Sequence, residues 1–345
     1  MPRCSMQREA AVSEVKRVAV TGARGFIGNV LCAALAARGV SILALLREAQ
    51  DGPWDEALLH KLGSGPIHHD FSGIDVVYHL AGYAHATDDS GGEESAYERT
   101  NVRGTQEVMQ AAIAGGVRRV IVFSSVKAMG EGAPVCLDEC APCRPVTAYG
   151  RSKRAAELAA LEMAAGTVTD VVVLRLPLVH GTGQKGNLTR MFKALAARRL
   201  PPLAAAGNRR SMVHVDDVTD AALRVGGCAC AGGEIYIVAP SQAYSTAEID
   251  AIMRDALGRA RARWRLPVAW LKPAALIGDV IGRLWGRSPF DSQALARLTE
   301  SAWYSGAKLA EHTGWQARRS LRDTFTDIVR QEQMCATSGS RTAGS

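Results

Sequence analysis

The 345-residue sequence has few aromatic residues and no long run of basic residues. Phe, Trp and Tyr make up 6% of the chain, and the formal net charge of +7 is spread along it. Nucleic-acid binding uses stacking platforms and a concentrated basic surface, so we do not expect a nucleic-acid partner. The charge suits an anionic small molecule better. A hydrophobic content of 47% is enough for one large α/β domain, or for two domains that share a cleft.

The first 16 residues carry charges and lack the apolar core of a signal peptide. With eight cysteines in the chain, we therefore expect a reducing, cytoplasmic setting. Cys136, Cys140 and Cys143 form the tightest group, but no clear fourth metal ligand lies near them in the sequence. We expect free thiols in a loop and assign no metal, with a metal site as the alternative.

The sequence also lacks an uninterrupted apolar segment of membrane-spanning length. The nearest candidate, residues 266–286, is broken by Lys272, Pro273, Asp279 and Arg283. Charged side chains at such positions are costly in hydrocarbon, so we expect no integral membrane span. An amphipathic helix packed on the protein is favoured here, and contact with a membrane surface is the alternative.

Short apolar runs alternate with helix-like stretches through the first half of the chain. The predicted strands lie at residues 17–20, 41–46, 75–81, 119–125 and 170–177, and the clearest helices lie near 94–115 and 147–164. Strands that are apolar throughout, rather than at every second residue, are typical of a parallel sheet covered on both faces. The sequence therefore predicts an α/β fold with a Rossmann-type, doubly wound parallel sheet.

The regular alternation ends near Gly181, which indicates a second, smaller lobe. Helices are predicted there near residues 187–199, 216–226, 245–258 and 318–333, and the strand at 233–239 is expected to return to the first sheet. We predict four parts: a flexible leader (1–16), a Rossmann domain (17–180 plus about 212–240), a discontinuous substrate lobe (about 181–211 and 241–333) and a disordered tail (334–345).

The stretch "TGARGFIG" joins the first predicted strand to the first predicted helix. It places Gly22, Gly25 and Gly28 around Phe26 and Ile27. Glycines at this spacing let the backbone turn sharply and approach a pyrophosphate, whose charge is then met by the free N–H groups at the helix end. We therefore predict a dinucleotide-binding turn; a simple tight turn is the alternative.

Arg47 follows the second predicted strand, at the place where a ribose-binding carboxylate would mark NAD. A guanidinium there can pair with a 2′-phosphate, so NADP is favoured over NAD, although a solvated strand-end charge is also possible. Asp70, followed by Phe71, is a candidate to accept a hydrogen bond from the adenine amino group. The segment "HLAG" offers small residues where the backbone must lie close to the cofactor. Its candidate contacts are Leu80, Ala81 and Gly82.

Tyr149 and Lys153 lie four residues apart in a predicted helix, so their side chains project from one face. A phenol titrates near pH 10, and lowering that pKa to neutrality takes about 4 kcal/mol of preferential stabilisation of phenolate. A lysine beside a nicotinamide cation could supply it, and the tyrosine would then exchange a proton as hydride moves. Ser124 and Ser125 end a predicted strand, where ligand crevices form in such sheets.

Together these motifs resemble the extended short-chain dehydrogenase/reductases of the NAD(P)-dependent nucleotide-sugar epimerase/dehydratase group, over roughly residues 17–330. The resemblance implies that Ser125, Tyr149 and Lys153 are catalytic, and that Lys153 also binds the nicotinamide ribose. It further implies a homodimer that pairs through the helices near 94–115 and 147–164. The remaining implied contacts are Pro177 to Val179 for the carboxamide, Asn187 for the substrate phosphate and Arg210 for the diphosphate. Lys127, close to Ser125 in the sequence, is a further candidate substrate contact.

Some residues depart from the family pattern and narrow the reaction. Val126 and Lys127 stand where sugar-dehydrating members carry an acidic pair, so we do not expect 4,6-dehydration. Met129 and Ser211 also differ from the usual tyrosine and aspartate. The expected reaction is 4-keto reduction or 4-epimerisation of a UDP-hexose or UDP-N-acetylhexosamine, with the UDP-N-acetylquinovosamine-forming branch most similar. The alternatives are reduction of a steroid- or flavonoid-like ketone and a non-catalytic dinucleotide sensor.

Overall fold

The computed structural model describes residues 15–84, 92–184, 186–199, 202, 207–260, 267–285 and 291–342. Residues 1–14 of the predicted leader lie outside this part of the chain. The two leader residues that are described belong to the folded domain. Val15 is buried in the core, and the Lys16 N–H donates to the Asp75 carboxylate at 2.7 Å.

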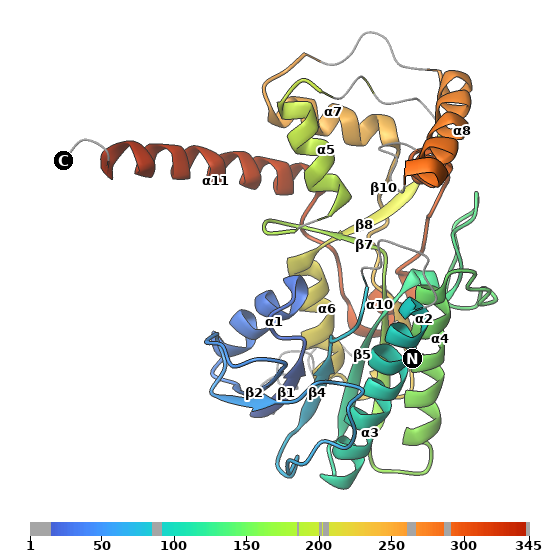
Figure 1. The fold of residues 1–345 in the computed structure, drawn as a ribbon. Helices are drawn as coiled ribbons and strands as arrows, with labels where there is room; N and C mark the ends of the chain where they lie inside the picture. The colour runs from blue at the N-terminus through green and yellow to red at the C-terminus, as the bar shows by residue number, and fades with distance from the viewer. Residues whose placement is uncertain are drawn as a thin grey trace.

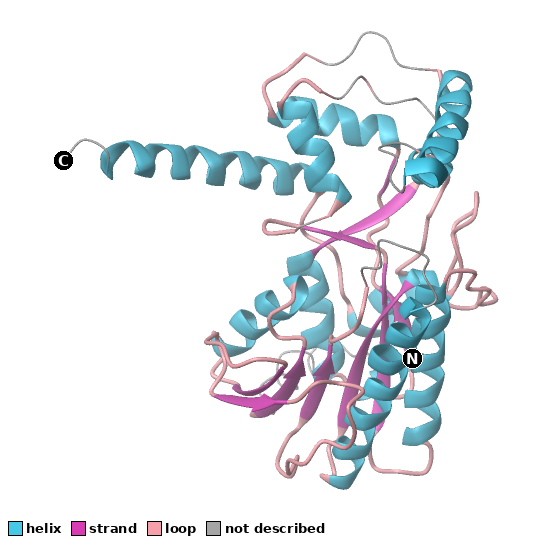
Figure 2. Cartoon of the chain, viewed as in Figure 1, coloured by secondary structure: helices cyan, strands magenta, loops and turns pink. Residues whose placement is uncertain are grey.

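Within the described residues, a seven-stranded sheet has the order β3-β2-β1-β4-β5-β6-β9, and every pair in it is parallel (Figures 1 and 2). This is the predicted doubly wound fold, with the crevice expected where the strand order reverses, between β1 and β4. The strands are β1 (Arg17–Thr21), β2 (Ser41–Leu46), β3 (Glu56–Leu59), β4 (Val76–His79), β5 (Arg119–Ser125), β6 (Asp170–Leu176) and β9 (Ile235–Ile237).

Helices cover both faces of this sheet, which explains why the central strands are apolar on both sides. One core cluster joins the sheet to α1 (Phe26–Ala36) and α6 (Val215–Gly227). The other joins it to α3 (Gly104–Ala114) and α4 (Ala148–Ala164). The predicted helix near 94–115 is divided in three, because α2 (Gly92–Tyr97) and a π-helical turn (Glu98–Arg103) precede α3.

A second lobe lies beyond the carboxyl ends of the strands, with the three-stranded sheet β10-β8-β7 between it and the Rossmann domain (Figure 1). Its core is formed by apolar side chains of α5, α7, α11 and β8, among them the stacked rings of Phe192 and Phe325. The strands of the small sheet are β7 (Leu178–His180), β8 (Arg210–His214) and β10 (Ala243–Tyr244), and the lobe helices are α5 (Asn187–Ala196), α7 (Thr246–Ala256), α8 (Val268–Trp285), α9 (Ser292–Thr299) and α11 (Leu321–Thr342). The helix α10 (Ala307–Thr313) instead packs on the Rossmann domain, where Leu309 belongs to the core cluster with α1 and α6.

Two parts of the chain differ from the sequence-based expectation. The strand β3 was not predicted, because Glu, Ala and Leu favour helix over strand and only its place beside β2 makes it extended. The helix α11 continues to Thr342, although disorder was predicted from residue 334. No proline interrupts this stretch, so a helix begun on the lobe core can propagate into it. No helix in the described ranges is both long and apolar enough to cross a membrane.

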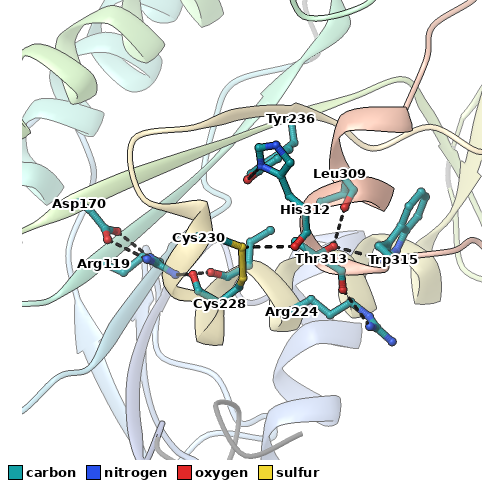
Figure 3. The surroundings of a disulfide bond; sticks show 11 residues. Arg119, Asp170, Arg224, Cys228, Cys230, Tyr236, Leu309, His312, Thr313 and Trp315 are labelled. Atoms are coloured by element: carbon teal, nitrogen blue, oxygen red, sulfur yellow. Dashed lines mark hydrogen bonds and ion pairs between the residues drawn. A yellow bond between two sulfur atoms is a disulfide. The ribbon is translucent and has the colours of Figure 1, made fainter. Parts of the chain in front are cut away.

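Cys228 and Cys230 form a disulfide just after α6 (Figure 3). Their backbone is held by Arg119, whose guanidinium donates to the Cys228 carbonyl at 2.6 Å and pairs with Asp170. The disulfide differs from the expectation of a reducing setting, in which the cysteines would be free thiols. Cys136, Cys140 and Cys143 are free thiols, and the described residues contain no group of three or more His, Cys, Asp or Glu side chains that could hold a metal ion.

Candidate active site

The glycine turn joins β1 to α1 at the carboxyl edge of the sheet. Gly22 has a positive φ of 71°, and a Cβ there would lie 2.7 Å from the Ala81 nitrogen. A Cβ at Gly28 would lie 2.1 Å from the Gly22 carbonyl oxygen, so the first turn of α1 packs directly on the glycine turn. Phe26 and Ile27 begin the helix, whose free N–H groups provide the anion-binding end that a pyrophosphate requires. These residues fit a dinucleotide.

The loop after β4 continues this crevice. A Cβ at Gly82 would lie 3.0 Å from the Lys153 Nζ and 3.2 Å from the Asn101 Oδ1, so only a glycine leaves this strip of backbone open. Asn101 holds the loop on both sides: its Oδ1 accepts from the Tyr83 N–H at 2.7 Å, and its Nδ2 donates to the Tyr83 carbonyl. The open strip beside the lysine fits the close approach that was predicted for Leu80, Ala81 and Gly82.

A chain of buried hydrogen bonds holds the loop after β4 in place on its buried side. Thr105 uses its single hydroxyl proton on the Asn101 carbonyl at 2.6 Å, so it must accept from His79 Nε2 at 2.9 Å. The His79 Nδ1 then accepts from the Thr21 hydroxyl at 2.8 Å, and Thr21 in turn accepts from the Ala81 N–H. Burial and the nearby Lys153 lower the pKa of His79 to about 3, so the ring is neutral.

Ser125 and Tyr149 meet at the carboxyl edge of β5. Ser125 is the last residue of that strand, and its hydroxyl also lies 3.5 Å from the Leu176 carbonyl of the neighbouring strand. Tyr149 is in the first turn of α4, which Thr147 caps. Burial raises the pKa of Tyr149, while a hydrogen bond with the Ser125 side chain lowers it. The two predicted catalytic hydroxyls therefore face one another.

Gly150 allows this meeting and was not singled out in the sequence. A Cβ on this residue would lie 2.4 Å from the Lys127 carbonyl oxygen, in the short 3-10 turn that follows Ser125. The helix α4 can therefore approach the end of β5 only because residue 150 has no side chain. This close approach sets the position of Tyr149 relative to Ser125.

We expect Gly150→Ala to lower kcat by between about tenfold and a hundredfold, because the new methyl group must push Tyr149 away from Ser125. Denaturant unfolding should be measured beside turnover, since alanine alone would stabilise a helix by up to about 1 kcal/mol relative to glycine. A variant that is more stable and fully active would show that the contact does not position the tyrosine.

Lys153 lies one helical turn after Tyr149, and its Nζ donates to the Phe123 carbonyl at 2.9 Å. Burial lowers the pKa of Lys153 to about 8, and the Glu157 carboxylate opposes that shift. Lys153 is not among the groups that shift the pKa of Tyr149 in this structure, where burial dominates. The structure places the Lys153 ammonium beside Gly82. The expectation that Lys153 and a nicotinamide cation together lower the pKa of Tyr149 stays a prediction.

The depressed lysine pKa has a consequence for stability. Between pH 8 and the ordinary lysine pKa of 10.5, the folded protein binds fewer protons here than the unfolded chain, so this group makes stability rise with pH. We expect the unfolding free energy of the wild type, relative to Lys153→Met, to increase by at least about 1 kcal/mol from pH 8 to pH 10. Urea unfolding of both proteins across this range measures it, and a constant difference would contradict the buried ammonium.

A buried ion pair links α4 to the neighbouring strand β6. Glu157 is fully buried on α4 and accepts two hydrogen bonds from Arg175, at 3.0 Å from Nε and 2.7 Å from Nη2. It also accepts from the Ser124 hydroxyl at 2.6 Å and from Arg154 at 2.9 Å. We call Ser124, Arg154, Glu157 and Arg175 the Glu157 cluster. Because the Ser124 hydroxyl donates its proton to Glu157, Ser125 is the one of the two candidate serines that faces Tyr149.

Aromatic side chains cover the tyrosine from α2 and from the loop after β4. The rings of Tyr97 and Tyr149 are 5.9 Å apart, and those of Tyr83 and Tyr97 are 5.2 Å apart. The sequence analysis did not identify Tyr83, Tyr97 or Asn101, because none of them is part of a motif with a fixed residue spacing. The available signal for Asn101 was an amide in a helical stretch, where asparagine is unfavourable unless its side chain has a partner.

Asp70 and Phe71 lie away from this crevice. The chain leaves β3 at His60 and returns to the amino edge of the sheet before Asp70, which lies within the electrostatic reach of Arg17 at the start of β1. Phe71 is buried there, against Gly115 at the end of α3. Neither residue can contact a dinucleotide at the glycine turn. The prediction failed because it placed a strand at the segment containing Asp70 instead of at β3.

Other predicted contacts do lie at the carboxyl edge. Arg47 is exposed directly after β2. Pro177 is buried at the end of β6, and Val179 follows on β7, whose end lies next to Phe26: a Cβ at Gly181 would lie 3.2 Å from that ring. The segment that was predicted to bind the carboxamide therefore borders the glycine turn.

The predicted substrate contacts lie on three different segments. Lys127, in the turn after Ser125, pairs with Glu131. Asn187 begins α5, and its side-chain oxygen accepts from Arg190. Arg210 begins β8 and donates to the Glu300 carbonyl at 3.1 Å. The second lobe thus supplies Asn187 and Arg210 from elements that lie above the sheet edge (Figure 1).

A parallel sheet with a glycine turn after its first strand, and with Ser125, Tyr149 and Lys153 at its carboxyl edge, defines an extended short-chain dehydrogenase/reductase. The chain belongs to the NAD dependent epimerase/dehydratase family, whose sequence pattern matches residues 18–239. It is therefore an NAD-dependent enzyme of that family.

Individual relatives are distant but match along nearly their whole length. A UDP-glucose 4-epimerase of Vibrio cholerae is 28% identical over 320 residues, which are 90% of this chain and 93% of that protein. A 4-hydroxy-2-methyl-3-oxo-4-farnesyl-3,4-dihydroquinoline-1-oxide ketoreductase of Stigmatella aurantiaca is 27% identical over 329 residues, 91% and 96% of the two chains. The solved structure of MoeE5 in complex with UDP-glucuronic acid and NAD has a TM-score of 0.72 and 25% identity, with 92% and 99% coverage.

Proposed function

We propose that this enzyme exchanges hydride at the 4-position of a UDP-linked hexose or N-acetylhexosamine, by 4-keto reduction or by 4-epimerisation, in nucleotide-sugar or surface polysaccharide biosynthesis. The observation that carries the proposal is that the Ser125 and Tyr149 side chains lie close enough at the crevice edge for Ser125 to lower the pKa of Tyr149. Two hydroxyls held together there can bind one reacting oxygen. A UDP-sugar as the substrate is supported by the names of the Vibrio relative and of the MoeE5 complex.

Each residue of the site has a role in this reaction. A bound nicotinamide dinucleotide would supply the hydride chemistry at the sugar C4. Tyr149 would give a proton to the oxygen on C4 during reduction and take it back during oxidation, while Ser125 holds the same oxygen. Lys153, beside the open backbone of Gly82, would bind the nicotinamide ribose with its ammonium. Asn187, Arg210 and Lys127 would hold the sugar and its diphosphate.

The reaction type is decided by two incubations: 4-keto UDP-hexoses with NADH or NADPH, and a panel of UDP-hexoses with NAD+ or NADP+, which can accept the hydride from C4. Net loss of the reduced-nicotinamide absorbance identifies a reductase. Formation of the C4 epimer without any net change in absorbance identifies an epimerase, which returns its hydride to the other face of the same sugar. Absence of both products from the whole panel would refute the proposal.

Reduction of a ketone that carries no nucleotide is a second candidate, favoured by the name of the Stigmatella relative. The two candidates differ in whether the second lobe binds a diphosphate. UDP should therefore raise the thermal unfolding temperature of the wild type, and Arg210→Ser should reduce that protection if Arg210 contacts the diphosphate. Absence of any UDP effect would favour the nucleotide-free ketone.

We propose NADP as the preferred cofactor, because Arg47 is exposed where a 2′-phosphate would lie. Arg47→Ser should then lower kcat/KM with NADPH by at least about tenfold, since a charge-assisted hydrogen bond is lost. The same change should leave kcat/KM with NADH nearly constant. Equal effects on the two cofactors, or preference of the wild type for NADH, would assign Arg47 to the solvent. A cytoplasmic homodimer that pairs through α3 and α4 remains part of the proposal.

A further inference from the structure

The helix α8 contacts the protein through small residues and one carboxylate. Ala275 and Gly278 are buried toward the protein, and Asp279, the only acidic residue of α8, accepts from the backbone N–H and the hydroxyl of Ser292 at the start of α9. Of the α8 residues whose burial the structure describes, Ala275 and Gly278 are the buried ones, and both are small.

Five large apolar side chains of α8 are exposed. Trp270, Leu276, Ile277 and Val280 are 72%, 63%, 61% and 54% exposed. At 100° per residue, these four positions and the exposed Ile281 fall on one broad helix face. Large side chains gathered on one exposed face mark an interaction surface, whereas scattered single ones do not. We call Trp270, Leu276, Ile277, Val280 and Ile281 the α8 apolar face.

The charge of the surrounding sequence indicates what covers this face. Residues 259–287 contain seven Arg or Lys and one Asp, a net charge of +6 in a chain whose total is +7. The same segment contains three of the six tryptophans, at positions 264, 270 and 285. Tryptophan is the side chain that lies at the level of lipid headgroups, and basic residues beside an apolar helix face are attracted by anionic lipids.

We infer that the α8 apolar face docks on the surface of an anionic lipid bilayer, with the helix lying in the plane of the interface. A second copy of the chain is disfavoured as the occupant, because self-association would bring two segments of net charge +6 together. The helix α8 lies in the second lobe, apart from the strands of the seven-stranded sheet (Figure 1). The inference is independent of which ketone or sugar the enzyme acts on.

The test is flotation with vesicles that contain about 30% phosphatidylglycerol, in about 0.1 M salt, compared with pure phosphatidylcholine vesicles. The wild type should float with the anionic vesicles, and Leu276→Glu/Ile277→Glu should lower the bound fraction at least about tenfold. The matched control Leu59→Glu/Val168→Glu makes the same charge change at side chains that are 57% and 77% exposed elsewhere, and should float like the wild type.

A second readout does not depend on any variant. Tryptophan emission of the wild type should shift to the blue with anionic vesicles and be quenched by brominated lipid, because tryptophan of α8 enters the interface. Failure of the wild type to bind anionic vesicles overturns the inference. So does equal loss of binding in the control, or a concentration-dependent dimer that the Leu276/Ile277 variant dissociates while no vesicles are bound.

Discussion

Replacing Tyr149 by phenylalanine is expected to lower kcat by about 10²–10⁴-fold while dinucleotide affinity stays within about twofold of the wild type. The change removes one oxygen and leaves the ring in place against Tyr97. Without the hydroxyl, no group at this position can exchange a proton with the reacting oxygen, and Ser125 loses the neighbouring hydroxyl with which it would hold that oxygen. Single-turnover measurements and cofactor fluorescence titration separate the chemical step from binding.

Tyr83→Phe is the matched control, because it removes a hydroxyl from the neighbouring ring of the same aromatic group. Its kcat should remain within about threefold of the wild type, since Tyr83 is held in the loop through its backbone atoms rather than placed beside Ser125. Residual turnover of Tyr149→Phe above a tenth of the wild-type rate, or an equal loss in Tyr83→Phe, would remove Tyr149 from the proposed acid/base role.

Glu157→Gln is expected to have the largest effect on stability, a loss of about 3–5 kcal/mol of unfolding free energy. Arg175 is only 1% exposed, and its guanidinium makes two hydrogen bonds to the Glu157 carboxylate. Removing the negative charge leaves a buried cation without its counter-ion. It should also lower the pKa of Lys153 further, because Glu157 is the group that opposes the effect of burial there. Urea unfolding at pH 7 measures the first effect.

The other members of the Glu157 cluster supply the controls. Arg154 is partly exposed, so Arg154→Gln should cost less than about 1 kcal/mol although it contacts the same carboxylate. The double variant Glu157→Gln/Arg175→Met should recover much of the loss, because it removes the unpaired cation as well. If Arg154→Gln destabilises as much as Glu157→Gln, the ion pair with Arg175 is not what stabilises α4 on the sheet.

The core of the fold could be predicted because its elements carry their own local signals. The central strands are apolar on both faces, and helices separate them at regular intervals, so parallel pairing is the arrangement that buries both sides. The strand β3 carries no such signal: its residues favour helix, and hydrogen bonds to β2 decide its conformation. The outward orientation of α8 also escaped prediction, because hydrophobic periodicity defines a face but not what that face contacts.

The site could be predicted where fixed spacing relates residues directly. Tyr149 and Lys153 share a helix face, and the glycine turn precedes a helix, so both motifs are defined within one segment. Asn101 and Gly150 act through contacts with distant segments, at Tyr83 and at Lys127, which no local pattern contains. Asp70 was misplaced for a related reason, since an error in locating one strand moved it from one edge of the sheet to the other.

The imidazole at position 79 bears on how the pH–rate profile of this enzyme should be interpreted. It has no proton to gain above about pH 4, and both of its nitrogens are already engaged by hydroxyls. The loop that borders the crevice will therefore keep its anchor through mild acidification. An acidic limb near neutrality, of the sort often ascribed to histidine, would therefore not originate in His79.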